Sequence, residues 1–334
     1  MVYVHVPFCR SFCTYCDFYS EIRRQDFLEP YVDSLVREAV RRREEIEESS
    51  AVNTLYFGGG TPSVLPLSAF SRIVQSIGGG PFDEFTVEVN PDDIVSRGEG
   101  FLDGLRSLGV NRISMGVQSL DDGMLRWMNR RHNARGAGEA FKMLREAGFS
   151  NVSLDVIYGV SGMSESSLVE TLRGIALWEP EHISAYQLSI EEGSTLCQMV
   201  RDGRYVELDE SSCRRQYEIV CRELSRAGYG HYEISNWARE GFEAVHNSAY
   251  WTRAPYVGLG PGAHSLRIAG GRQLRSWNSH QLPFWACEGT EELTVEQIRM
   301  ETLMLGLRTA EGVCGKRIPE RDWFIADSII ADLI

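Results

Sequence analysis

Six short runs of β-branched and apolar residues, set at regular intervals, limit most strongly how this chain of 334 residues can fold. Amphipathic stretches separate the runs, and several of them end in a glycine such as Gly109 or Gly148, as helices often do. Strands that alternate with helices form parallel β/α units, which coil in a right-handed sense. We therefore expect an α/β fold with an open or closed barrel.

The expected strands cover residues 2–6, 54–57, 85–89, 112–117, 152–157 and 182–188. The expected helices lie near 27–48, 67–77, 99–108, 134–147 and 164–178. After about residue 190 the pattern changes, and further helices are expected at 210–227 and 295–307. We divide the chain into a barrel at 1–195 and a C-terminal domain at 196–334.

Residues that carry chemistry follow the expected strands at the same end. A cysteine motif follows the first strand and Gly-Gly-Gly-Thr-Pro (58–62) the second, while Glu88, Gln118 and Asp155 lie at the ends of the next three. In a β/α barrel the active site lies at the carboxyl ends of the strands. The pattern therefore predicts a single site that these strands share.

The cysteine motif is Cys-Arg-Ser-Phe-Cys-Thr-Tyr-Cys, with Cys9, Cys13 and Cys16 in a CxxxCxxC spacing. Iron–sulfur clusters are held by cysteine thiolates, usually four, so three thiolates predict a [4Fe–4S] cluster with one open iron position. That position suits the amino and carboxylate groups of S-adenosylmethionine (SAM). Structural zinc would call for four ligands in paired spacings. Three buried structural cysteines are the remaining alternative.

Side chains beyond the cysteines fit a SAM site. The glycines of 58–62 allow a close backbone approach to a ligand, although a tight turn before a helix would also use them. Glu88 and Asp155 could accept hydrogen bonds from ribose hydroxyls or an amine. Arg130 could pair with the methionine carboxylate or lie solvated on the surface. Tyr3 either contacts the cofactor or packs inside the barrel.

A second constellation is His-Asn-Ser-Ala-Tyr-Trp at residues 246–251. Histidine can ligate haem iron, and the flat faces of tyrosine and tryptophan suit a porphyrin. The residues taken alone favour a different interpretation, in which this segment is a turn in the core with satisfied polar groups.

Charge and composition narrow the class of protein. The formal net charge of −13 argues against a nucleic-acid partner, which calls for a basic surface. No apolar stretch approaches the roughly 20 residues of a membrane-spanning helix, so we expect no integral membrane segment, and peripheral contact with a membrane stays open. The N-terminus does not resemble a signal peptide, and the remaining cysteines are scattered, as expected in the reducing cytoplasm.

Together these motifs resemble the coproporphyrinogen III oxidase-like branch of the radical SAM superfamily, from residue 3 to about residue 312. The segments that carry the resemblance are Tyr-Val-His-Val-Pro-Phe-Cys (3–9), Gly-Gly-Gly-Thr-Pro-Ser (58–63), Val-Glu-Val-Asn-Pro (87–91), Arg-Ile-Ser-Met-Gly-Val-Gln-Ser (112–119), Asp-Val-Ile-Tyr-Gly (155–159), Glu-Ile-Ser-Asn-Trp-Ala (233–238) and the motif at 246–251. The resemblance implies a partial (β/α)6 radical SAM barrel and a C-terminal α+β domain.

The resemblance also implies roles for individual residues. The cluster ligands would be Cys9, Cys13 and Cys16. The residues expected to contact SAM are Tyr3, Tyr15, Gly59, Gly60, Thr61, Glu88, Gln118, Arg130, Asp155 and Ile157. The residues expected to contact haem are His246, Asn247, Tyr250 and Trp251.

Within this branch, the chain is more similar to the HemW family of haem chaperones than to the oxygen-independent coproporphyrinogen III oxidase. The oxidase carries a further cysteine where Phe18 stands here, and it has a segment before the barrel that we expect to be absent, since the first strand begins at residue 2. The 246–251 motif is typical of HemW. The family usually ends in a small helical module, and residues 307–330 look short for it.

The HemW resemblance implies a protein that binds a [4Fe–4S] cluster, SAM and haem, and that delivers haem to haem-dependent respiratory proteins. Two alternatives stay open. One is oxidative decarboxylation of coproporphyrinogen III, and the other is a radical SAM methyltransferase of the same branch.

Overall fold

The computed structural model describes residues 1–22 and 25–334. Its centre is a nine-stranded sheet with the order β11-β1-β4-β5-β6-β7-β8-β10-β9. The expected strands are present as β1 (Val2–Val6), β4 (Thr54–Gly59), β5 (Glu84–Val89), β6 (Arg112–Gln118), β7 (Val152–Tyr158) and β8 (His182–Gln187). They pair in parallel and in chain order, which confirms the α/β fold with a partial barrel.

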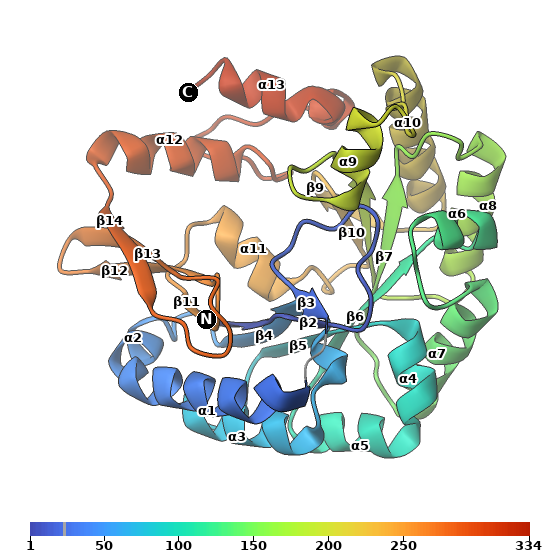
Figure 1. The fold of residues 1–334 in the computed structure, drawn as a ribbon. Coiled ribbons are helices and arrows are strands. Elements are labelled where there is room, and N and C mark those ends of the chain that lie inside the picture. Colours follow the sequence, from blue (N-terminus) through green and yellow to red (C-terminus); the bar gives the residue numbers. More distant parts are fainter. Residues whose placement is uncertain (23–24) are drawn as a thin grey trace.

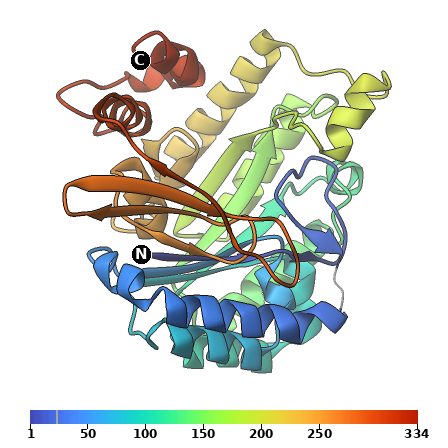
Figure 2. The same ribbon diagram turned by 60° about the vertical axis from the view of Figure 1, so that its left-hand side comes forward.

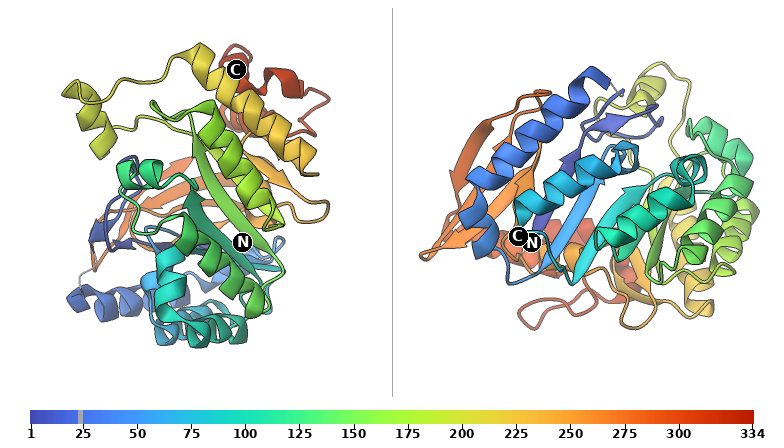
Figure 3. Two further views of the ribbon diagram at one scale, coloured as in Figure 1. Left: turned by 90° about the vertical axis from the view of Figure 1, so that its right-hand side faces the viewer. Right: turned by 90° about the horizontal axis from the view of Figure 1, so that it is seen from below.

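Helices cover the outer face of these parallel strands (Figure 3, right). They are α1 (Gln25–Arg41), α2 (Arg43–Glu48), α3 (Leu67–Ile77), α4 (Pro91–Arg97), α5 (Glu99–Ser107), α6 (Asp122–Trp127), α7 (Ala134–Glu146) and α8 (Glu165–Ala176). The single helix expected over 27–48 is divided between α1 and α2, and the short helices α4 and α6 were not predicted. As predicted, Gly109 and Gly148 follow α5 and α7 with positive φ angles of 93° and 82°.

Alternation along β1 places its side chains on two different faces. Val2, Val4 and Val6 are almost fully buried, as expected for a strand covered by helices. Tyr3 and His5 point to the opposite face of the strand, because successive side chains alternate. That inner face is where the cavities of this molecule open.

The chain after residue 195 extends the same sheet and adds a second one. Its elements are α9 (Thr195–Arg201), α10 (Glu210–Arg226), β9 (Gly230–Glu233), β10 (Asn236–Ala238), α11 (Val245–Trp251), β11 (Val257–Leu259), β12 (His264–Ala269), β13 (Arg272–Asn278), β14 (Cys287–Glu292), α12 (Val295–Gly306) and α13 (Ala326–Ala331). Strand β10 pairs antiparallel with β8, and β11 pairs in parallel with β1. The boundary at residue 195 stays a prediction, because strands from both sides of it share one sheet.

Strands β12, β13 and β14 form a separate antiparallel sheet that lies beside α1 and the N-terminal strand (Figure 2). Helices α12 and α13 lie on the side of the molecule opposite α1, α3 and α5 (Figure 1). Among the residues that the structure describes, no helix is both long and apolar enough to cross a membrane.

The turn that the residues alone favoured at 246–251 is wrong, because this segment belongs to helix α11. The Glu84 side chain accepts hydrogen bonds from the backbone N–H groups of Val245 and His246, at 2.8 and 3.1 Å. Glu84 on β5 therefore accepts hydrogen bonds from backbone amides of the first helical turn, which have no acceptor within the helix itself.

Candidate functional site

A cavity of about 530 Å³, here called the first cavity, opens at the carboxyl ends of the parallel strands. Its volume lies in the range of ligand pockets, roughly 300–1,000 Å³. The predicted residues that line it are Cys9, Cys13, Tyr15, Cys16, Gly59, Gly60, Thr61, Glu88, Gln118, Arg130, Asp155 and Ile157. The residues predicted from the strand ends therefore do line one cavity, although they come from distant parts of the sequence.

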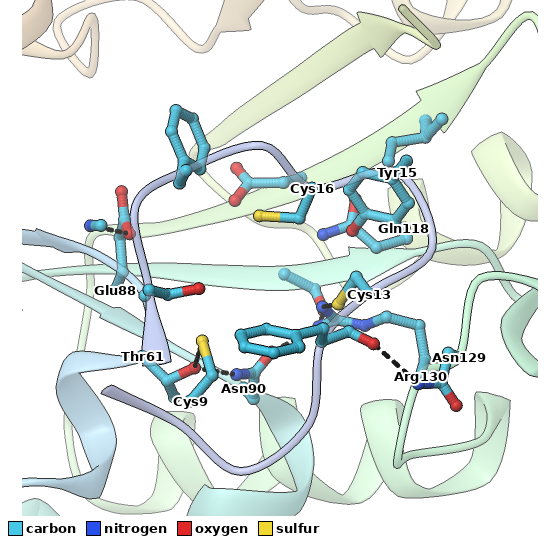
Figure 4. Close-up of a pocket in the computed structure, with 18 of the residues that line it drawn as sticks. Cys9, Cys13, Tyr15, Cys16, Thr61, Glu88, Asn90, Gln118, Asn129 and Arg130 are labelled. Atoms are coloured by element: carbon cyan, nitrogen blue, oxygen red, sulfur yellow. Dashed lines mark hydrogen bonds between the residues drawn. The ribbon is translucent and has the colours of Figure 1, made fainter. Parts of the chain in front are cut away.

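The cysteines lie on β2 (Phe8–Cys9) and on the loop that follows it, and their sulfur atoms point toward a common space (Figure 4). Hydrogen bonds fasten this loop to the end of α6. Thr14 donates its backbone N–H to the Met128 carbonyl at 3.1 Å, and Asn129 donates its side-chain amide to the Phe12 carbonyl at 2.7 Å. The thiols are therefore positioned by the neighbouring β/α unit.

The donor set suits a group larger than one metal ion. In residues 1–22 and 25–334, no three His, Cys, Asp or Glu side chains converge closely enough to hold a single ion. In an iron–sulfur cube each thiolate binds a different iron, so its ligands stand farther apart than those of one ion. Burial raises the pKa of Cys16 to about 12, so a cluster must displace a proton from this thiol when it binds. The cysteines thus fit the predicted cluster.

Arg130 reaches into the first cavity beside the cluster loop. One guanidinium nitrogen donates to the Cys13 sulfur at 3.2 Å, and the other donates to the Gly116 carbonyl at 2.7 Å and to the Asn90 side-chain oxygen. Its buried Nε has no hydrogen-bond partner among the described residues. This hydrogen bond places the Arg130 guanidinium directly beside one of the predicted cluster ligands. The pairing with a SAM carboxylate stays a prediction.

Two carboxyl groups face the same cavity. Glu88 accepts hydrogen bonds from the Tyr56 hydroxyl at 2.7 Å and from the Gly59 N–H at 3.1 Å. Burial raises the pKa of Glu88 to about 7, and burial also raises the pKa of Asp155, which accepts from the Ser114 hydroxyl at 3.3 Å. A ligand that brings hydroxyl or ammonium donors would favour the ionised forms. This arrangement fits the ribose and amino groups of SAM.

The glycine loop has a packing role as well as its predicted role toward a ligand. A Cβ atom on Gly59, whose φ angle is +104°, would lie 2.5 Å from a ring carbon of His5. A Cβ atom on Gly60 would lie 2.9 Å from the carbonyl oxygens of Val6 and Phe8. Glycines here therefore let the end of β4 pack directly against β1 and the start of the cluster loop.

Gln118 ends β6 in a conformation that is unusual for a side-chain-bearing residue. Its φ angle is +66°, and the β6–β7 register shifts between Gly116 and Gln118. Bulges and left-handed residues at strand ends often aim a side chain into a functional site. The bulge brings Gln118 to the wall of the first cavity (Figure 4).

Tyr3 is the predicted SAM contact that the structure does not place in the wall of the first cavity. It lines another cavity of about 540 Å³, here called the second cavity, which it shares with Tyr250 of α11. The Tyr3 hydroxyl lies 3.0 Å from Nδ1 of His5. The motif at the start of the chain therefore contributes to two different sites.

The residues expected to contact haem occupy different environments. His246 is buried, and its ring nitrogens lie 2.8 Å from the Thr54 hydroxyl and 3.2 Å from the Tyr250 hydroxyl. Burial lowers the pKa of His246 to about 3, so the ring is neutral. The buried Trp251 Nε1 has no partner in the described part of the chain, and Asn247 is half-buried. Tyr250 is the motif residue that lines the second cavity.

Several polar residues of the first cavity were not predicted from the sequence. They are Tyr56, Asn90, Ser114, Tyr186 and Gln187. Asn90 comes directly after β5, and Tyr186 and Gln187 end β8, so the strand-end rule that found Glu88 also covers them. Tyr56 and Ser114 lie inside strands, where side chains alternate between the two faces of the sheet. The sequence alone does not show which of those faces lines the cavity.

The chain is similar to known proteins over most of its length. The radical SAM superfamily model matches residues 3–175. The heme chaperone HemW of Bacillus subtilis is 32% identical over 96% of this chain and 86% of its own length. The heme chaperone HemW of Synechocystis is 30% identical over 99% of this chain and 83% of its own length. The mitochondrial radical S-adenosyl methionine domain-containing protein 1 of Danio rerio is 31% identical over 93% of this chain and 73% of its own length.

One solved structure shares the fold over almost the whole chain. The coproporphyrinogen III oxidase HemN of Escherichia coli aligns with a TM-score of 0.71 and 23% sequence identity. The alignment covers 99% of this chain and 81% of that one. At 23% identity, this similarity shows that the two chains share a fold.

Proposed function

Because this chain belongs to the radical SAM superfamily and, within it, to the HemW family, we propose that it is a haem chaperone that binds haem and delivers it to haem-dependent respiratory proteins. Membership of the superfamily implies a [4Fe–4S] cluster and SAM. The observation that carries the proposal is the convergence of three cysteine thiols, a guanidinium and two carboxyl groups on one cavity, in a chain that matches HemW proteins over nearly its full length.

In the first cavity, Cys9, Cys13 and Cys16 would hold the cluster. When bound, the cluster and SAM together supply one-electron cleavage of a carbon–sulfur bond, and this chemistry belongs to the cofactors. The protein's part is to bind and orient. Arg130 donates a hydrogen bond to the Cys13 sulfur at 3.2 Å, and Tyr56 holds one oxygen of Glu88 in place by a 2.7 Å hydrogen bond.

The structure contains a feature that bears on the rival decarboxylase activity. Phe18, which stands where the decarboxylase carries a further cysteine, is 66% exposed and lies on the wall of the first cavity. A phenyl ring there has no thiol that could take part in proton or electron transfer with a porphyrinogen. This supports the chaperone proposal over oxidative decarboxylation.

An anaerobic incubation tests the proposal. Reconstituted protein is mixed with SAM, a strong reductant and coproporphyrinogen III, the products are identified by mass spectrometry, and haem is titrated into a parallel sample. We expect saturable haem binding and unchanged coproporphyrinogen III, with 5′-deoxyadenosine as the internal control for a working cluster. A vinyl product would show a decarboxylase instead, and a protein that takes up no haem would end the chaperone proposal.

A further inference from the structure

The second cavity lies on the other side of the loop that follows Cys16. Asp17 and Phe18 of this loop line both cavities. Its walls come from β1, from the loop, and from the C-terminal segments that close on β1. The rings that line it include those of Tyr3, Tyr19, Tyr250, Tyr256, His264 and His280.

Two histidines of this cavity have free ring nitrogens. His264 begins β12 and His280 follows β13, and both are exposed. Within residues 1–22 and 25–334, neither imidazole has a hydrogen-bond partner. His5, at the floor of the same cavity, differs, because its nitrogens lie 3.0 Å from the Tyr3 hydroxyl and 2.9 Å from the Tyr19 carbonyl. His264 thus keeps its ring nitrogens available for a ligand, and His280 keeps Nδ1 available, since its Nε2 edge packs on Gly262.

Packing fixes the ring of His280 in one orientation. It stacks on Tyr19 with ring centroids 4.6 Å apart and an angle of 15° between the planes. Its edge rests on Gly262, where an added Cβ would lie 2.7 Å from Nε2.

Tyrosine rings make up much of the remaining wall. Tyr250 and Tyr256 meet edge to face, with centroids 4.8 Å apart and planes at 84°. The Tyr250 hydroxyl lies 3.2 Å from Nε2 of His246, which is buried behind it. His246 therefore acts as a positioning residue for Tyr250. Flat apolar faces with polar tips suit a planar, largely apolar ligand.

We propose that the second cavity is the haem site of this protein, and that His264 and His280 supply the imidazole ligands to the haem iron. A cavity of about 540 Å³ with aromatic walls and two free imidazoles matches an iron porphyrin better than it matches a polar substrate. The assignment rests on the proposed function, since it names the residues that bind the haem. In this assignment the 246–251 motif contributes to the haem site through the ring of Tyr250.

The test compares haem binding by wild type, His264→Ala, His280→Ala and the double variant. Reconstituted protein is titrated with ferric haem, and difference spectra are recorded against the same protein without haem. Iron-free protoporphyrin is titrated in parallel. Gln281→Ala, an exposed neighbour of His280, is the matched control. The SAM-responsive cluster signal of each variant reports on the fold.

We expect each single variant to change the haem spectrum, and the double variant to bind haem at least about tenfold more weakly, the lower end of the loss seen when a metal site is weakened. Binding of iron-free protoporphyrin and the cluster signal should not change. Added imidazole should restore the wild-type spectrum, because it replaces the missing ligand. If the double variant loses its cluster, the haem affinity and the haem spectrum of the two single variants test the assignment instead.

A double variant that keeps the wild-type affinity and spectrum would overturn the assignment of the second cavity. The chaperone proposal would survive that result, because wild type would still bind haem elsewhere. Absence of haem binding by wild type would instead overturn both. The two failures are therefore distinguishable within one experiment.

Discussion

The first and second cavities have nearly equal volumes, about 530 and 540 Å³, but different linings. Thiols, carboxyl groups and a guanidinium line the first, whereas phenols and imidazoles are prominent in the second. The first follows from the parallel strands, whose carboxyl ends meet at one face. The second forms where C-terminal segments around β11, β12 and β13 close on β1. A single loop, which contains Asp17 and Phe18, therefore separates the proposed cluster and SAM site from an aromatic site.

The largest effect is expected from the loss of a cluster ligand in the first cavity. Cys13→Ser should abolish the SAM-responsive cluster after anaerobic reconstitution, because only two thiolates then remain to hold the cube. Iron content and electron paramagnetic resonance spectra with and without SAM measure this. Haem binding in the second cavity should persist.

Cys197→Ser is the matched control, since Cys197 is half-buried on α9 and does not line the first cavity. It should reconstitute like wild type. A normal SAM-responsive spectrum from the Cys13 variant would show that the three-cysteine assignment is wrong.

The pH dependence of SAM binding should depend on Glu88. Its pKa, raised by burial to about 7, means that the carboxyl group gains a proton as the pH falls below 7 and then accepts fewer hydrogen bonds. SAM affinity should fall about tenfold for each pH unit below that value. Isothermal titration from pH 6 to 8 measures it, and Glu88→Gln should bind more weakly at pH 8 and lose the dependence. An unchanged slope in Glu88→Gln would remove Glu88 from the SAM site.

The same raised pKa has a consequence for stability. The ordinary pKa of Glu88 is 4.5, so its protonated form stabilises the fold at acid pH, and that contribution is lost as the pH rises through about 7. Glu88→Gln should therefore lose less stability than wild type between pH 5 and 8 in the absence of ligand. Chemical denaturation at both pH values measures the difference.

A smaller effect should appear in the second cavity when Glu38 of α1 is changed. The buried Glu38 carboxylate accepts hydrogen bonds from the Gly260 N–H at 3.0 Å, Asn278 at 2.8 Å and Trp285 at 2.6 Å. Glu38→Gln should lower the free energy of unfolding by about 3 kcal/mol, because buried donors lose a charged acceptor. It should also weaken haem binding while the cluster signal stays normal.

The control for this change is Glu29→Gln, because Glu29 is exposed and pairs with Arg72 at the surface. Its effect on stability should stay within about 0.5 kcal/mol. If Glu38→Gln altered the cluster signal and left haem binding intact, the expected effect of Glu38 on the second cavity would be wrong.

The sequence predicted the first cavity well for a physical reason. Buried parallel strands are β-branched runs, and their ends carry motifs such as the one at Cys9–Cys16, so strand and site are found together. The second cavity gave no such signal. Strands β10 and β11 are three residues long, and His264 and His280 line the same cavity as Tyr3 only because β11 pairs with β1. No local pattern encodes that pairing, and none encodes Glu84 as the acceptor at the start of α11.

The most direct test of separate sites is a haem titration of cluster-loaded protein that is saturated with SAM, followed by absorbance and electron paramagnetic resonance spectra of the same sample. If the cluster and SAM occupy the first cavity and haem the second, one haem should bind while the SAM-perturbed cluster signal persists. Displacement of SAM by haem, in proportion to the haem bound, would show that the two ligands compete for one cavity and would contradict this account.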